Sequence, residues 1–270
     1  MSGDSDGVPR CLPVVQQYGR YYGLWPQREQ RKQGEQGGQG EYLLPIDAEE
    51  LDRMDLFHKV LLEAREKALF LPDLPQHRPL RVLDLGTGTG IWAIDVAEQS
   101  TEEPVIMTVD LHNIQPEFRL APGSGYIEHV EIDWKPKWEE GTQPRESALE
   151  EWSILYLKAL KQLGRDAGIS PMVVRREMKA AGFTDFREVT IRCYVNACMS
   201  NRREWEVANW FNLVLDQGFE PMSLKPMIEG LRMSQDGIRE LCRSAKEEIR
   251  ILRHRAYFTV HIWSARRPPY

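Results

Sequence analysis

The sequence has no long apolar run, no excess of positive charge and no recognisable signal peptide. No stretch approaches the roughly 18 apolar residues that a membrane-spanning helix requires. Its 35 basic and 41 acidic residues give a net charge of −6, which argues against binding nucleic acid through a basic surface. We therefore expect a soluble intracellular protein, cytoplasmic, nuclear or both, with no membrane attachment and no direct nucleic-acid binding.

Cysteine is also scarce. The four cysteines, Cys11, Cys193, Cys198 and Cys242, lack the paired spacing of a metal site. In a reducing compartment they are expected to be free thiols. We predict no metal centre, and 270 residues are enough for one large α/β domain with helical additions.

The most informative stretch runs from Arg81 to Ile94 (RVLDLGTGTGIWAI). Val82–Leu85 is a short apolar run, typical of a strand in a parallel sheet covered on both faces. Gly86, Gly88 and Gly90 then alternate with threonines, and glycine lets the backbone approach a small ligand closely. The amides of a helix that starts directly afterwards point back toward such a ligand. The pattern indicates a loop for a nucleotide-type cofactor.

The spacing excludes two common nucleotide loops. The NAD fingerprint needs glycine at its first, third and sixth positions, and counting from Gly86 the sixth position is Ile91. The phosphate loop of nucleotide-binding proteins is excluded because no Gly-Lys-Ser/Thr follows. Asp84 suits a ligand with an ammonium group, and S-adenosylmethionine carries one beside its sulfonium. Asp110 ends the next apolar run, where an acid can accept hydrogen bonds from both ribose hydroxyls. The alternative is a glycine-rich turn and an ordinary strand-end aspartate. We predict cofactor contacts from Asp84, Gly86, Thr87, Gly88, Gly90 and Asp110.

Several motifs together resemble the fungal LaeA-like class I methyltransferases. The glycine loop continues to Asp95 and is followed by Asp110-Leu111 and Ile114–Pro116. The likeness covers about residues 18 to 267, with gaps. It also includes Tyr42–His58 (YLLPIDAEELDRMDLFH), Gly125–Asp133, Ala181–Asp185 and His261–Arg266.

The resemblance implies a Rossmann-like class I methyltransferase sheet with helices on both faces and S-adenosyl-L-methionine as the cofactor. It implies a role in fungal secondary metabolism, as a regulator or as a tailoring enzyme. The methyl acceptor would be a small metabolite or a protein, and velvet-type regulatory proteins are implied as partners. The protein would place the acceptor for in-line attack on the methyl carbon, mainly through proximity and orientation.

The centre of this sheet is predicted to be shortened. Leu111–Ser124 contains Pro116 and Pro122 and shows neither helical nor strand periodicity. The resembled family places two strands with their helices here, before a turn that corresponds to Leu120–Gly123. Parallel strands need a crossover of about a dozen residues or more, usually helical. We therefore predict that two central or edge strands are lacking after Pro116.

The chain divides into a polar start and one domain. Residues 1–40 are rich in glycine and glutamine, so we expect them to be disordered or loosely ordered. Asp47 and Glu50 form a capping box that starts a helix, and His58 beside its apolar stripe is more often structural than catalytic. Residues 41–270 are predicted as the methyltransferase-like domain, with a helical lid at 47–70, a cofactor half at 80–116, and a C-terminal half at 120–270 that carries a helical insertion at 201–253.

No catalytic residue can be assigned from the sequence. Glu128, His129 and Glu131 are candidates for a general base by position only, and a surface role is as good an interpretation. A second hypothesis is a catalytically impaired interaction protein, or a truncated splice or gene-model product. Loss of buried strands exposes apolar surface and strand edges. The free-energy cost of either defect can exceed the net free energy of unfolding of a typical protein, about 5–15 kcal/mol. We therefore predict weak or no cofactor affinity.

Overall fold

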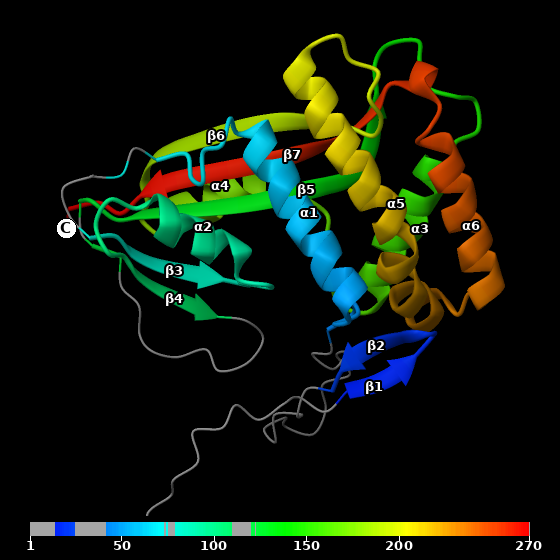
Figure 1. The fold of residues 1–270 in the computed structure, drawn as a ribbon, viewed down its shortest axis with the longest axis horizontal. Coiled ribbons are helices and arrows are strands. Elements are labelled where there is room, and N and C mark those ends of the chain that lie inside the picture. The colour runs from blue at the N-terminus through cyan, green and yellow to red at the C-terminus, as the bar shows by residue number, and fades with distance from the viewer. Residues whose placement is uncertain are drawn as a thin grey trace, which may run out of the picture.

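The protein is described by a computed structural model that covers residues 14–24, 42–72, 74, 79–109, 120–121 and 123–269. Figure 1 shows the arrangement of its elements. In chain order they are β1 (Val14–Gln17), β2 (Arg20–Gly23), α1 (Ala48–Ala64), β3 (Arg81–Leu85), α2 (Ile91–Gln99), β4 (Val105–Val109), β5 (Tyr126–Trp138), α3 (Ala148–Gln162), α4 (Pro171–Ala180), β6 (Thr184–Tyr194), α5 (Arg202–Leu231), α6 (Gln235–Glu248), the 3-10 helix η1 (Leu252–His254) and β7 (Ala256–Arg266).

The architecture is α/β and Rossmann-like, as predicted. Strands β3 and β4 are parallel neighbours connected through α2, with Val82 opposite Ile106 in the register. Strands β5, β7 and β6 form a second sheet in which β7 lies in the middle and is antiparallel to both neighbours. The strands β1 and β2 form a separate hairpin.

The described strands of the main domain form two separate sheets. Figure 1 shows β3, β4 and β5 running in the same direction, yet among the described strands β3 pairs with β4 alone, and β5 pairs with β7 alone. Within the described ranges, no strand lies between Val109 and Tyr126 in the sequence. Residues 110–119 and 122, where the interruption was predicted, lie outside the described part of the chain.

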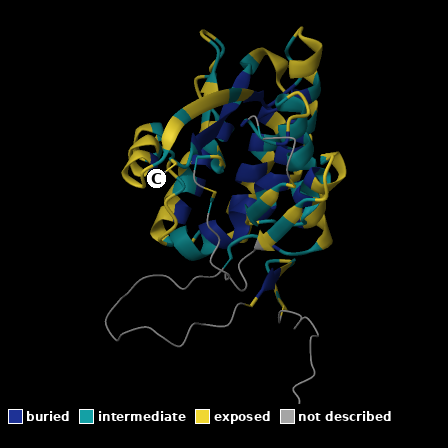
Figure 2. Cartoon of the chain, turned by 90° about the vertical axis from the view of Figure 1, so that its left-hand side faces the viewer, coloured by how far each residue is buried: buried dark blue, intermediate teal, exposed yellow. Residues whose placement is uncertain are grey.

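Alternate residues of β7 supply both faces of the three-stranded sheet. Phe258, Val260 and Ile262 are fully buried in the main core, where α1, α3, α5 and α6 also contribute side chains. Trp263 and Ala265 face the other way and form a smaller cluster with Met178 of α4. Helices therefore lie on both faces of this sheet, as predicted, with α4 covering part of its face. Figure 2 shows the buried residues concentrated in the middle of the molecule.

The helical segment predicted at 201–253 contains α5 and α6, which lie between β6 and β7 in the chain. Asn201 caps α5, because its side chain accepts hydrogen bonds from the amides of Arg203 and Glu204. Ser234 caps α6 in the same way. The core beneath them is aromatic: Trp152 of α3 has its ring centroid 4.8 Å from that of Phe219. None of the helices in the described ranges is long and apolar enough to cross a membrane.

The prediction of a loosely ordered segment at 1–40 is wrong for β1 and β2. Tyr22 is fully buried, with the Lys225 ammonium 5.0 Å from its ring centroid. Arg20 donates from Nε to Asp47 Oδ2 at 2.7 Å, which joins the hairpin to the start of α1. This short segment carries three tyrosines and precedes the tract that is rich in glycine and glutamine. Residues 1–13 and 25–41 lie outside the described part of the chain.

Replacing Asp47 by alanine is expected to destabilise the protein. Asp47 caps α1 by accepting the Glu50 amide at 3.2 Å, and it also holds Arg20. Loss of such a cap costs about 1–2 kcal/mol of unfolding free energy. The hydrogen bond from Arg20 lowers the pKa of Asp47 below its ordinary value. Its contribution is therefore fully present above the unfolded-state pKa and is lost as the pH falls through the folded-state pKa.

The measurement is urea unfolding of the wild type and the variant at pH 7 and at about pH 3, below the ordinary carboxyl pKa. The difference between the two proteins should shrink at the lower pH. Asp52→Ala is the matched control, since it removes an exposed acid from the same helix. We expect it to change stability by less than about 0.5 kcal/mol. Equal effects of the two substitutions would contradict the double role of Asp47.

Candidate functional site

The glycine turn links the carboxyl end of β3 to the first residue of α2. Gly86, Gly88 and Gly90 have φ values of 79°, 54° and 81°, in the left-handed region that side chains disfavour. The amide of Gly90 donates to the carbonyl of Thr87 at 2.8 Å, which closes the turn. Gly90 is also the N-cap residue of α2. The left-handed backbone of this turn therefore explains why glycine occupies all three positions.

The structure brings five of the six predicted contact residues into this turn. Asp84 is half-buried near the end of β3 and lies opposite Thr108 of β4 in the register. Gly86 is exposed, and a Cβ added to it would meet no atom within 4 Å. The hydroxyl of Thr87 is buried and has no hydrogen-bond partner in the described ranges. Asp110, the sixth predicted residue, lies outside the described residues.

Helix α1 lies against this turn. A Cβ built on Gly88 would collide with the methyl group of Met54, so the Met54 side chain occupies the space that this glycine leaves free. The Thr89 hydroxyl donates to Asp55 Oδ1 at 2.5 Å. The predicted lid helix and the predicted cofactor half are therefore in contact.

A second contact joins α1 to α2. His58 Nε2 lies 2.7 Å from Asp95 Oδ2, and both side chains are largely buried. This contact gives His58 a structural role, the interpretation that the sequence favoured. The indole Nε1 of Trp92 in α2 also donates to the carbonyl of Leu69, at 3.0 Å.

The sequence did not identify Met54, Asp55 or Asp95 as parts of this site. Asp55 and His58 are three residues apart, a spacing that places them on one face of a helix, and this signal could have pointed to them. Contact between Met54 and Gly88 has no such signal. It depends on how α1 packs across the turn.

The residues of this site fit a nucleoside cofactor with one adjustment. The space beside Gly86 is open, while the space beside Gly88 is filled by the flexible end of a methionine. Methionine has three rotatable side-chain bonds and repacks readily. In the described ranges, no group of three histidine, cysteine, aspartate or glutamate side chains is arranged to hold a metal ion.

The candidates for a general base are engaged in other contacts. Glu128 accepts hydrogen bonds from Arg65 Nη2 and from the Leu71 amide, both at 2.6 Å, and so ties the chain after α1 to β5. His129 and Glu131 pair with each other at 2.9 Å on an exposed part of the sheet. Their surface role is the interpretation that the geometry supports.

Curated relatives match almost the whole chain. It is 36% identical to "Secondary metabolism regulator laeA" of Fusarium oxysporum f. sp. lycopersici, over 93% of this chain and 92% of that protein. It is also 36% identical to "Secondary metabolism regulator LAE1" of Gibberella fujikuroi, with the same coverage. A relative in Aspergillus flavus is 30% identical over 85% of this chain. No family model matches the chain.

The alignment with the Fusarium protein shows that this chain is shorter in places. The alignment is 302 positions long, whereas 93% of 270 residues is about 251. About fifty positions of the relative, the difference between 302 and 251, therefore have no counterpart here. This number agrees with the predicted loss of two strands and their helices.

Similarity to solved structures is weak. The chain matches phosphoethanolamine N-methyltransferase 2 of Haemonchus contortus in complex with S-adenosyl-L-methionine at a TM-score of 0.37 and 12% identity, over 78% of this chain and 53% of that one. It matches YcgJ from Bacillus subtilis at a TM-score of 0.33 and 10% identity, over 78% and 99%. TM-scores below 0.5 do not establish a shared fold.

The contact between Met54 and Gly88 can be tested by a double-mutant cycle. Gly88→Ala should lower the free energy of unfolding by about 1–2 kcal/mol, because alanine is strained in a left-handed conformation. A further loss is expected because the new Cβ displaces Met54. In a Met54→Ala background this second part disappears, which gives a coupling of about 0.5–1 kcal/mol. The measurement is denaturant unfolding of the four proteins. Gly86→Ala is the matched control: it has the same strained backbone and open space, so it should not couple to Met54. Additive effects for both glycines would exclude the contact.

Proposed function

Because the chain belongs to the LaeA and LAE1 family of secondary metabolism regulators, we propose that it is an S-adenosylmethionine-dependent methyltransferase that acts in fungal secondary metabolism. The relatives match nearly the whole chain, and their names describe regulators, which favours regulation over a tailoring step. The structural observation that supports the proposal most is the glycine turn, with three left-handed glycines between a parallel strand and a helix.

Each residue of the turn has a defined task in this proposal. The bare backbone at Gly86 lets the cofactor approach, and the first amides of α2 face it. Asp84 accepts hydrogen bonds from the ammonium group of the methionine part, and Asp110 is the predicted partner of the ribose hydroxyls. Met54 turns away from Gly88 when the cofactor binds. S-adenosylmethionine supplies a methyl group that its sulfonium already activates, so the protein mainly orients the acceptor and excludes water.

The acceptor and the partners extend this proposal. The acceptor is a small metabolite or a protein. On the resemblance alone, a velvet-type regulatory protein is the proposed partner, and the protein acts in the cytoplasm, the nucleus or both. None of these steps requires a basic surface, which agrees with the net charge of −6.

A second candidate function is a non-catalytic interaction protein. The divided sheet favours it, because β3 has one hydrogen-bonded neighbour among the described strands, and its unit exposes Leu85, Ile94 and Val105. The absence of counterparts for about fifty positions of the relative favours it as well. In this case the glycine turn is inherited from an enzyme and no longer binds the cofactor.

Isothermal titration with S-adenosylmethionine distinguishes the two candidates. For the methyltransferase we expect saturable binding that is weaker than micromolar, because the division of the sheet leaves the turn poorly supported. Asp84→Asn should weaken it about tenfold or more, since a charged hydrogen bond contributes about 1.5–3 kcal/mol. Glu98→Gln is the matched control, as it removes an exposed acid from α2 at the end away from the turn.

Each outcome has a defined meaning once circular dichroism shows that the proteins are folded. Absence of saturable binding at millimolar cofactor would refute the methyltransferase and support the interaction protein. Micromolar binding that Asp110→Ala abolishes would support the methyltransferase and would show that the predicted weak cofactor affinity of this chain is wrong. Equal losses in Asp84→Asn and Glu98→Gln would mean that the turn is not the binding site.

A further inference from the structure

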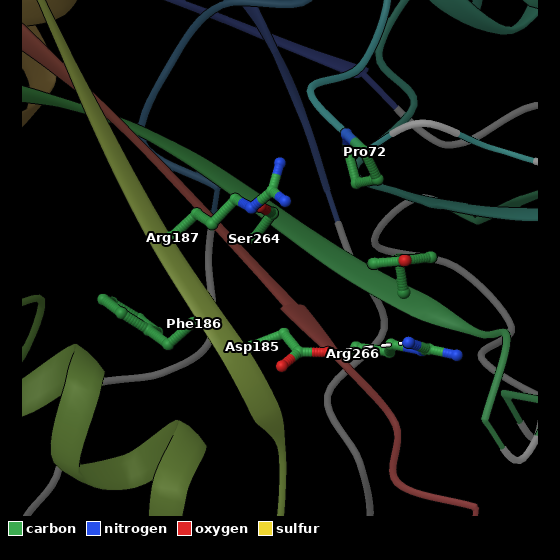
Figure 3. Close-up of a pocket in the computed structure, with 7 residues that line it drawn as sticks. Pro72, Asp185, Phe186, Arg187, Ser264 and Arg266 are labelled. Atoms are coloured by element: carbon green, nitrogen blue, oxygen red, sulfur yellow. Dashed lines mark ion pairs between the residues drawn. The ribbon is translucent and has the colours of Figure 1, made fainter.

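A cavity of about 310 Å³ lies at the end of the three-stranded sheet where β5 and β6 begin and β7 ends (Figure 3). It is remote from the proposed cofactor turn. The glycine turn is at the carboxyl end of β3, while the cavity is at the amino end of β5. Because β3 and β5 run in the same direction, the two places are at opposite ends of the strands. Its walls include Pro72, Tyr126, Asp185, Arg187, Ser264 and Arg266.

A β-bulge in β6 places Arg187 in this cavity. Thr184 pairs with Arg266 and Arg187 pairs with Ser264, so three steps along β6 match two steps along β7. In a regular strand, residues three apart point to opposite faces of the sheet. The extra residue of the bulge brings Thr184 and Arg187 to the same face. Figure 3 shows Arg187 beside Ser264, with Phe186 pointing away from it.

The bulge also strains the backbone. Asp185 has a φ of 53°, in the left-handed region that residues other than glycine rarely adopt. Strained backbone of this kind gathers at ligand-binding sites, where it holds a side chain in an otherwise unfavourable place. Here it accompanies the turning of Arg187 into the cavity.

Among the described residues, no carboxylate pairs with Arg187. Asp185 lies 3.6 Å from Arg266, and Glu128, which is opposite Ser264 in the register, lies 2.6 Å from Arg65. Arg187 is exposed and makes no ion pair with any carboxylate of the described ranges. These two acids are thus engaged with other arginines, and the Arg187 guanidinium, which has no carboxylate partner in the described ranges, is available to bind an anion.

The floor and walls of the cavity add a hydroxyl and an apolar surface. Ser264 is only 3% exposed and lines the cavity, and its hydroxyl bonds to no other residue of the described part of the chain. Tyr126 and Pro72 contribute an aromatic ring and a pyrrolidine ring to the wall. This hydroxyl is not among the fully buried polar atoms that lack a partner, so a ligand in the cavity can reach it and accept its hydrogen bond.

We propose that this cavity binds a small organic anion, whose carboxylate or phosphate group accepts hydrogen bonds from Arg187 and Ser264 while a flat apolar body lies against Tyr126 and Pro72. The planar fork of a guanidinium matches both acidic groups. A volume near 310 Å³ falls within the range of small-molecule sites. Because the cavity is at the opposite end of the strands from the glycine turn, it is a separate site and not the acceptor site of the proposed methyl transfer.

The test is a ligand-observed NMR titration of the full chain with phenyl phosphate, with phenol as the neutral analogue. We expect saturable binding of phenyl phosphate, no saturable binding of phenol, and about tenfold or greater weakening in Arg187→Met. Arg187→Lys, which keeps the charge but not the fork, should give an intermediate affinity.

The matched control is Arg192→Met. It removes an exposed arginine from the same strand, but that side chain lies over the Tyr257 ring on the opposite face of the sheet. It should leave the affinity unchanged. Equal weakening by the two methionine variants, or no saturable binding to the wild type at millimolar phenyl phosphate, would overturn the proposal. Thermal unfolding of each variant shows that folded proteins are being compared.

Discussion

Most of the folded protein depends on the backbone hydrogen bonds that β7 makes with β5 on one side and β6 on the other. One face of β7 supplies Phe258, Val260 and Ile262 to the main core, and the other supplies Trp263 to the cluster under α4. Strand β7 follows β5, β6, α5 and α6 in the chain. The sheet therefore cannot form before β7 is available, and the helices between β6 and β7 must pack around a strand that follows them in the sequence.

The glycine turn belongs to a less strongly supported part of the molecule. Its unit, β3-α2-β4, has one pair of strands and leaves Leu85, Ile94 and Val105 largely exposed. Parts of a protein with few buried apolar contacts open at a lower free energy than its core. A ligand that binds only the ordered unit would stabilise it, and some of the binding free energy would be spent on that ordering. Cofactor affinity and local order are therefore linked in this chain.

The sequence predicted those parts of the fold that local rules determine. The alternating glycines required a turn with left-handed residues, and Asn201, Ser234 and Asp47 cap their helices as their residue types indicate. Local rules also have limits here: Glu50 was expected to complete a capping box, yet its carboxylate pairs with Arg53 at 2.6 Å in a buried position. The predicted lack of two strands after Pro116 followed from the shortness of the connection, since parallel strands need a long crossover, and it stays a prediction because residues 110–119 lie outside the described ranges.

The remaining features depend on packing that the sequence does not display. Strict alternation counted from Thr184 would place Arg187 on the opposite face of the sheet. The bulge between these two residues adds one residue and so brings them to the same face. Strand β5 continues to Trp138, past the end of the motif Gly125–Asp133, because β7 is long enough to pair with it. Composition averaged over residues 1–40 does not show that Tyr22 is fully buried, while Val14 and Tyr21 of the same hairpin are about half exposed.

The two sets of contacts along α1 have a mechanical consequence. Asp47 at its start holds the hairpin through Arg20, and Met54, two turns later, lies in the hollow of Gly88. Two turns of helix form a stiff segment about 10 Å long, so a displacement at Asp47 is carried to Met54. A molecule that tilts the hairpin would therefore change the space at the glycine turn without touching it.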